Sequence, residues 1–237
     1  MNLVKYLDTR FYPDYKNNWD DDLFRNEILK VLKQDDIILD LGAGAGIIPQ
    51  MDFSKEVHKV FGIDPDPRVK TNAYLTEGKV AFGEDIPYPN GYFDVVFADN
   101  VLEHLAQPKK VFDEIYRVLK PGGFFLGKTP NQYHYMPLIS KLTPTSFHKW
   151  YNKLRGRNIE DTFHTCYLVN SEKDYNRACM NSHLNSVSVC LYEGRPEYLR
   201  ISFLTYILGI IYQKVVSSTD HLKHFRILMV VVSKKPD

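Results

Sequence analysis

Three glycines alternate with alanines in the segment ILDLGAGAGIIPQ, residues 37–49, directly after an apolar run that contains Asp40. Glycine leaves bare backbone that a ligand can approach closely, where we expect free N–H donors. A dinucleotide fingerprint would read GxGxxG, but here the third glycine comes one residue early and Ile47 takes the later position. A carboxylate two residues before the first glycine suits a ligand that carries an amine or a cation, and it disfavours a pyrophosphate.

Acidic and amide side chains also end the next three apolar runs. Asp64 ends KVFGID, at about the offset of ~20 residues where a ribose diol finds its acceptor. Asp85 follows the third run, where an exocyclic adenine amine could donate to it, and Asp99 and Asn100 end the fourth. Parallel strands present such ends at one edge of a sheet, so these groups are expected around one ligand. The competing interpretation is that each acid only caps a strand end.

Short apolar runs alternating with helical stretches position these residues. Strands are expected at 37–41, 59–63, 79–82, 94–98, 123–128, 186–193 and 225–233, and helices at 21–33, within PKKVFDEIYRVLKPGG, near 171–182 and near 197–216. This rhythm predicts an α/β fold: a Rossmann-like, seven-stranded, mostly parallel sheet with helices on both faces and an antiparallel last strand at its edge. We divide the chain into a lead-in with a helix (1–36), a core (37–128), a cap insertion (129–167) and a segment that completes the sheet (168–237).

In this order the motifs resemble those of the class I SAM-dependent methyltransferases, in the small-molecule branch similar to methyltransferase domain 11. The resemblance covers residues about 20 to 128. It implies S-adenosyl-L-methionine (SAM) as the cofactor, with Asp40 on the methionyl amino group, Asp64 on the ribose and Asp85 on the adenine. The cofactor-binding residues that it implies are Asp40, Gly42, Ala43, Gly44, Gly46, Asp64, Pro65, Glu84, Asp85, Ile86, Asp99 and Asn100.

The resemblance breaks down at one point. Only IIPQMDFSKEVH separates the glycine loop from the second strand, and Pro49 falls early in it. We therefore expect a single turn or an irregular loop in place of the family's long helix, with little help from a helix dipole.

The acceptor side has weaker signals. His104, shortly after the fourth strand, and His134 are the candidate general bases for an acceptor hydroxyl or amine, although His104 could instead cap or pack the following turn. Aromatic and cationic side chains crowd the cap insertion, where they could bind a ring or sugar that carries an anionic group, or form a satellite core with solvated charges. Further aromatics precede the first helix, either as a flap that closes over the cofactor or as a plain N-terminal strap. The substrate-binding candidates are Tyr12, Tyr133, Tyr135, His148 and Trp150.

Composition narrows the partners. Thirty Lys and Arg against 29 Asp and Glu give a formal net charge of +1, which argues against a nucleic-acid partner and leaves a small-molecule acceptor. The first ten residues do not resemble a secretory signal, and three cysteines without metal-binding spacing indicate reduced thiols in the cytoplasm and no metal site. Residues 201–212 carry no charge, so a buried or homodimer-facing helix is expected, and peripheral membrane contact is less favoured.

Two other functions compete with methyl transfer. A SAM-binding protein without catalysis could act as a regulator or partner, although the complete set of cofactor acids disfavours it. An NAD-dependent oxidoreductase of nucleotide sugars would need glycine in place of Ile47 and a Tyr-x-x-x-Lys pair near the sheet, which the chain does not supply at the right place.

Overall fold

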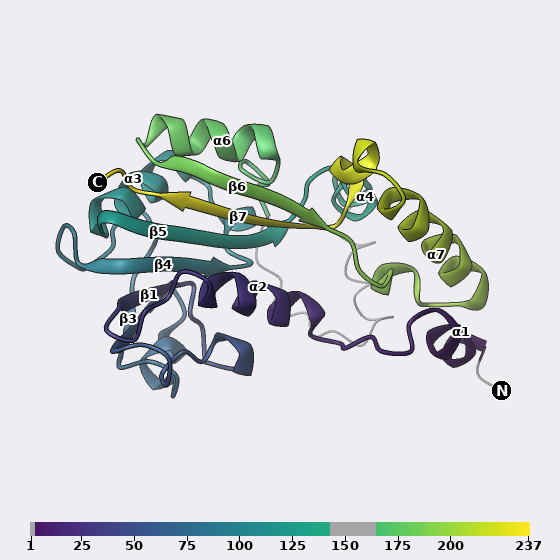
Figure 1. Ribbon diagram of the computed structural model, residues 1–237, viewed down its shortest axis with the longest axis horizontal. Coiled ribbons are helices and arrows are strands. Elements are labelled where there is room, and N and C mark those ends of the chain that lie inside the picture. Colours follow the sequence, from purple (N-terminus) through teal and green to yellow (C-terminus); the bar gives the residue numbers. More distant parts are fainter. Residues whose placement is uncertain (1–2, 143–164) are drawn as a thin grey trace. The chain divides into compact units, whose positions relative to one another are not determined.

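A seven-stranded sheet organises the computed structural model, which describes residues 3–142 and 165–237 (Figure 1). The strand order is β3-β2-β1-β4-β5-β7-β6. The strands are β1 (Ile37–Leu41), β2 (Lys59–Asp64), β3 (Glu77–Val80), β4 (Phe93–Asp99), β5 (Leu119–Pro130), β6 (Asn185–Tyr192) and β7 (Leu228–Lys234). The pairs β1–β2, β1–β4, β2–β3 and β4–β5 are parallel, so the predicted Rossmann-like, mostly parallel sheet is confirmed.

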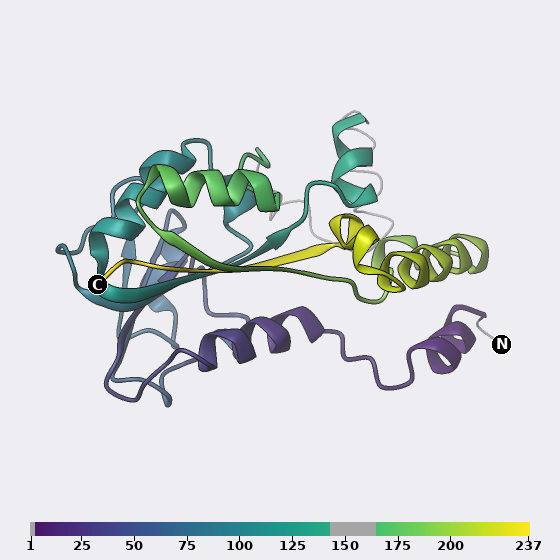
Figure 2. The same ribbon diagram turned by 45° about the horizontal axis from the view of Figure 1, so that its top comes forward.

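Helices cover both faces of this sheet. The α-helices in the described part of the whole chain, not all of which pack on the sheet, are α1 (Leu3–Phe11), α2 (Trp19–Leu29), α3 (Pro108–Val118), α4 (Tyr135–Leu142), α6 (Glu172–Asn181) and α7 (Phe203–Ser217). Figure 2 shows α3 and α6 on one face and α2 on the other. The α3 helix buries Val111, Phe112, Ile115 and Val118, which recur at helical spacing along one side. Phe112 packs against Tyr175 of α6 with ring centroids 5.8 Å apart, which joins the two helices on their shared face.

Central strands are apolar throughout because both of their faces are covered. Ile38 and Leu39 of β1 and Val96 and Phe97 of β4 are all fully buried. In the β1–β4 register Asp40 lies opposite Phe97, at the end of the strands where the polar residues collect.

The last strand corrects one prediction. β7 does run opposite to β4, β5 and β6, as its arrow shows in Figure 1, but it lies between β5 and β6 and is not an edge. Met229, Val230 and Val231 are buried, as in an interior strand, whereas the first three residues of β6, from Asn185, are exposed. The continuous apolar run in β7 was the signal for this position.

The connection after the glycine loop is short, as predicted. A 3-10 turn, Pro49–Met51, stands where the family's long helix would be, and its cap makes no side-chain hydrogen bond.

The lead-in differs from the prediction, because residues before α2 form a helix of their own, α1. The apolar segment near 197–216 becomes a 3-10 turn, Glu197–Leu199, followed by α7.

The described chain forms two compact units. One comprises residues 20–129, 165–190 and 229–237 and contains nearly all of the sheet; we call it the sheet unit. The other comprises residues 3–19, 130–142 and 191–228, with α1, α4 and α7; we call it the helical unit. Of the expected cap, residues 143–164 lie outside the described part of the chain.

Candidate functional site

The glycine loop of the sheet unit is tied to the end of β2. Gly42 N and Ala43 N donate to Ile63 O at 2.8 and 3.2 Å, and Gly44 N donates to Asp64 Oδ2 at 3.0 Å. The expectation of free backbone donors is therefore wrong for these three N–H groups. A loop whose donors are already used is poorly suited to cradle a pyrophosphate, which agrees with the absence of a dinucleotide fingerprint.

The three glycines serve different purposes. All have positive φ, at +88° for Gly42, +50° for Gly44 and +70° for Gly46. A Cβ on Gly42 would lie 2.3 Å from Val101 Cγ2, and one on Gly46 would lie 2.2 Å from Asn72 Oδ1. A Cβ on Gly44 would meet only Asp64 Oδ2, at 4.0 Å. Packing of the protein itself thus requires glycine at 42 and 46, whereas position 44 borders open space where a ligand can approach.

Asp64 shapes the other side of that space. Its two carboxylate oxygens accept from Gly44 N at 3.0 Å and from Asp66 N at 2.7 Å, across the intervening Pro65. Each oxygen keeps a second lone pair, so the carboxylate can still accept from a diol. The strand-end cap and the ribose acceptor are therefore compatible roles for this one side chain.

Asp40 is a buried carboxylate that the described residues leave without a hydrogen bond or an ion pair. It is 6% exposed at the end of β1. Burial raises the pKa of Asp40 well above its usual value, and the nearby charges of Asp99 and Asp64 raise it further. The described residues contain no group of three or more His, Cys, Asp or Glu side chains placed to hold a metal ion. An organic cation such as an ammonium group would relieve this electrostatic cost.

Asp99 is only half satisfied by the protein. Its Oδ1 lies 2.9 Å from Lys128 Nζ and accepts from Asn100 Nδ2 at 2.8 Å, whereas its Oδ2 is buried with no hydrogen-bond partner among the described residues. Burial raises the pKa of Asp99 to about 6 against the opposing effect of Lys128. Asn100 adopts φ +54° beside it. A buried acceptor without a donor points to a ligand in this space.

Lys128 is the residue that sequence reasoning missed. It is fully buried, lies opposite Asp99 in the β4–β5 register, and also contacts Asp20, at 3.1 Å, and Asp21 at the start of α2. Burial alone would lower the pKa of Lys128, but the three carboxylates raise it above its usual value. The sequence could have revealed it, because a lysine within the apolar strand GGFFLGKTP is expected to be buried and therefore paired. Lys128 holds Asp99 in place from the side opposite its unpaired oxygen.

The turn after β3 is held by a second ion pair that the sequence did not reveal. Ile86 N donates to Glu114 Oε2 at 2.8 Å, and Arg117, paired with Glu114, donates to Ile86 O at 2.8 Å. Ile86 is buried, its neighbour Glu84 is half-buried, and Asp85 is exposed. The turn that the resemblance assigns to adenine is therefore rigid on its inner side, with Asp85 on its outer side.

His104 lies in the sheet unit, in the 3-10 turn Leu102–His104 that follows β4. Its Nε2 is 3.9 Å from Glu103 Oε1, and its side chain is partly exposed. Glu103 is buried and accepts from Thr129 Oγ1 at 2.8 Å, and burial raises the pKa of its carboxyl group. A partly exposed imidazole 3.9 Å from a carboxylate is compatible with the role of a general base.

The other predicted residues belong to the helical unit or lie beyond the described chain. His134 is 1% exposed, and burial lowers its pKa to about 3. The Tyr135 ring is tilted by 43° against that of His134, with ring centroids 4.0 Å apart, and Tyr133 is exposed. Tyr12 donates to Gln213 Oε1 at 3.1 Å. His148 and Trp150 fall outside the described residues.

Comparison with known proteins identifies the domain. A family model described as a methyltransferase domain matches residues 39–127, which include the last three residues of β1, the glycine loop, β2 to β4 and most of β5. This stretch resembles a methyltransferase domain. The cofactor of such domains is SAM.

A relative in Mycolicibacterium vanbaalenii, described as an uncharacterized methyltransferase, is 36% identical over 92 residues, which are 36% of each chain. The chain thus spans only about a third of the length of this methyltransferase.

Solved structures agree with the methyltransferase fold over most of the chain. The YcgJ protein from Bacillus subtilis superposes with a TM-score of 0.57 at 16% identity, over 91% of this chain and 99% of that one. Geranyl diphosphate C-methyltransferase from Streptomyces coelicolor, solved with S-adenosyl-L-homocysteine, gives a TM-score of 0.54 at 17% identity, over 90% and 78%. In the part of the chain that the structure describes, no helix has the length and apolarity needed to cross a membrane.

Proposed function

We propose that this protein transfers the methyl group of SAM to a small or medium-sized organic acceptor of the sugar or lipid-linked precursor type. The observation that carries the proposal is Asp40, a buried carboxylate without a cation among the described residues, four residues before the loop glycine, Gly44, that borders open space. Without a bound cation, the free energy needed to bury this carboxylate would not be offset by any interaction.

Each side chain has a role in binding the cofactor. Asp40 and the unpaired oxygen of Asp99 face the cationic methionyl end, Asp64 accepts from the ribose, and the turn at Glu84–Ile86 borders the adenine. When bound, SAM supplies a methyl group on a positively charged sulfur, which leaves as neutral S-adenosyl-L-homocysteine when the methyl bonds to the acceptor. The protein therefore contributes mainly by aligning the two reactants and excluding water.

The acceptor loses a proton as its new bond to carbon forms, and we assign that proton to His104. Its imidazole is partly exposed and has Glu103 behind it. His134 fits this role less well, because a pKa of about 3 leaves its imidazole a weak proton acceptor at neutral pH. We propose that the cap segment 129–167, with Tyr133, Tyr135, His148 and Trp150, and the N-terminal Tyr12 bind the acceptor.

The first experiment measures SAM binding and methyl transfer separately. Isothermal titration of the full chain with SAM is expected to show one site, and SAM with a tritiated methyl group is expected to label a component of a cell extract. SAM binding without any labelled product would instead support a catalytically silent SAM-binding protein, and failure to bind SAM would overturn the cofactor site.

A variant pair then tests the base. His104→Gln should lower turnover at least about tenfold and leave SAM affinity unchanged, because only the proton acceptor is lost. His58→Gln, at an exposed position between β1 and β2, is the control and should change neither quantity. Equal loss of turnover and SAM affinity in His104→Gln would indicate a structural role for this histidine.

A further inference from the structure

Within the helical unit, α1 and α7 form one packed platform. Leu7, Tyr206 and Ile210 make a buried cluster between the two helices. Tyr12 extends the contact by stacking on Tyr206, with ring centroids 6.3 Å apart, and by its hydrogen bond to Gln213. The inner faces of both helices are thus used within the platform.

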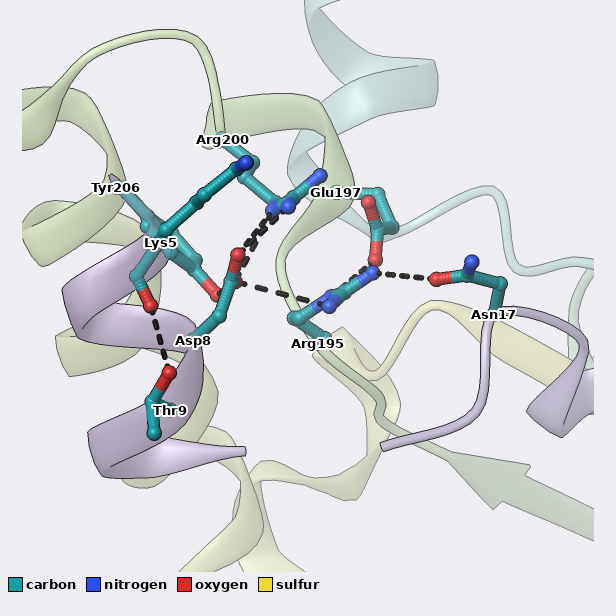
Figure 3. A network of polar contacts seen from close by, with 8 residues as sticks. All are labelled: Lys5, Asp8, Thr9, Asn17, Arg195, Glu197, Arg200 and Tyr206. Carbon is teal, nitrogen blue, oxygen red and sulfur yellow. Dashed lines mark hydrogen bonds and ion pairs between the residues drawn. The ribbon is translucent and has the colours of Figure 1, made fainter. Parts of the chain in front are cut away.

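A polar network locks this platform from the inside (Figure 3). Asp8 of α1 accepts from Arg200 Nη2 at 2.6 Å and from Tyr206 Oη at 2.6 Å. Arg195 lies 3.6 Å from the same carboxylate, pairs with Glu197 and donates to Asn17 Oδ1 at 3.0 Å. Asp8 is the only acid in α1 and α7, and both of its carboxylate oxygens accept hydrogen bonds from residues of the helical unit.

The outer face of α7 is apolar and exposed, so of the two expectations for residues 201–212, a buried or a homodimer-facing helix, the first is wrong for this face. Leu204, Leu208, Ile211 and Val215 are 73%, 63%, 53% and 50% exposed, and they recur every three or four residues along one side of the helix. On α1, exposed apolar side chains belong to Leu3, Tyr6 and Phe11. So contiguous an apolar surface on two packed helices indicates a partner.

Between the helices lies a groove of about 410 Å³. Its lining consists of Tyr6, Leu7, Arg10, Phe11, Ile207, Ile210, Ile211 and Lys214. The only charged groups in this lining are the cations Arg10 and Lys214, and Lys214 Nζ lies 5.1 Å from the Phe11 ring centroid. Lys5 adds a third exposed cation on α1. The exposed charges of the two helices are therefore all positive, since Asp8 is neutralised inside the platform.

We propose that the α1–α7 platform docks on the surface of a bilayer that contains anionic lipids. The apolar side chains of α7 would enter the boundary between headgroups and acyl chains, and the cations at the groove would meet lipid phosphates. Charge favours this partner over a second copy of the chain, which would bring the same cations to the same interface. The helix would lie in the membrane surface, since it is too short to span it.

Vesicle flotation of the full chain tests the proposal, without SAM or an acceptor. The protein should float with vesicles of phosphatidylcholine and phosphatidylglycerol, and much less with phosphatidylcholine alone. The double variant Leu204→Gln/Leu208→Gln should lower vesicle affinity at least about tenfold, and Lys214→Glu at least about fivefold.

Matched controls lie on α6. Met180→Gln, at a residue 71% exposed, and Lys173→Glu, also exposed, change the same chemistry elsewhere and should keep wild-type flotation. All of these positions are on the surface, so each variant should keep the wild-type melting temperature. A loss of flotation in the controls equal to that in the α7 variants would overturn the proposal.

Three other results would also overturn the proposal. One is equal binding to neutral vesicles. Another is a dimer in sedimentation velocity that Leu204→Gln/Leu208→Gln dissociates, with no vesicle binding, because a second copy would then cover the face. The last is binding of monomeric dodecyl phosphate in the groove without any flotation, which would indicate a free amphiphile. Methyl transfer is not measured in these assays, so failure here leaves the proposed activity untouched.

Discussion

Two carboxylates, the half-buried Asp8 of the helical unit and the buried Asp40 of the sheet unit, have opposite electrostatic surroundings. Asp8 in the helical unit is matched by Arg200, Arg195 and Tyr206, and Asp40 in the sheet unit has no cation or donor among the described residues. Burial alone would raise both pKa values, but the hydrogen bonds from Arg200 and Tyr206 lower that of Asp8, while Asp99 and Asp64 raise that of Asp40 further. A carboxylate completed by its own chain stabilises the fold, whereas one left incomplete indicates a ligand.

The largest effect is expected where the ligand approaches the backbone. Gly44→Val should abolish SAM binding, a loss beyond about a thousandfold, because the side chain would fill the open space beside this glycine. Gly91→Val is the control, since Gly91 has a similar φ of +62° and a Cβ there would meet nothing within 4 Å. Both variants should lose on the order of 1–3 kcal/mol of stability from the strained backbone. Isothermal titration should find SAM binding intact in Gly91→Val alone, and a Gly44→Val protein that binds SAM normally would place the cofactor elsewhere.

The next largest effect is expected for Asp40→Asn, which should change SAM affinity and the free energy of unfolding in opposite directions. Asp40→Asn should weaken SAM binding about 10- to 100-fold, because a charge-assisted contact is lost. The same change should stabilise the ligand-free protein by about 1 kcal/mol or more at neutral pH, because the variant no longer buries an unpaired charge. Since the folded pKa of Asp40 is raised, this gain should shrink as the pH falls toward the unfolded value of about 4. Urea unfolding at both pH values measures it, and a destabilised Asp40→Asn would make Asp40 a structural residue like Asp8.

The smallest effect is expected at Asp8, and it has the opposite sign. Asp8→Asn should cost about 1–2 kcal/mol of unfolding free energy, since Arg200 and the largely buried Arg195 lose their carboxylate partner. The folded pKa of Asp8 is lowered, so its stabilisation is fully present above the unfolded pKa of about 4 and disappears as the pH falls through the folded value. Urea unfolding of both proteins should therefore converge in acid. A variant as stable as the wild type at neutral pH would remove the contrast between the two carboxylates.

The sequence by itself determined the parts of this protein that depend on neighbours along the chain. Apolar runs that end in Asp40, Asp64 and Asp99 predicted the parallel strands, because alternation and strand ends are local properties. The early proline at 49 predicted the short turn after the glycine loop for the same reason.

Only the tertiary structure decided which side chains are completed by distant partners. Lys128 meets Asp20 from 108 residues away, and Arg200 meets Asp8 from 192 residues away. The crowding at Gly42, the interior place of β7 and the exposed face of α7 likewise depend on what packs alongside. Burial and pairing arise from the packing of segments far apart in the chain, so spacing alone could not distinguish a carboxylate that the fold neutralises from one left for a ligand.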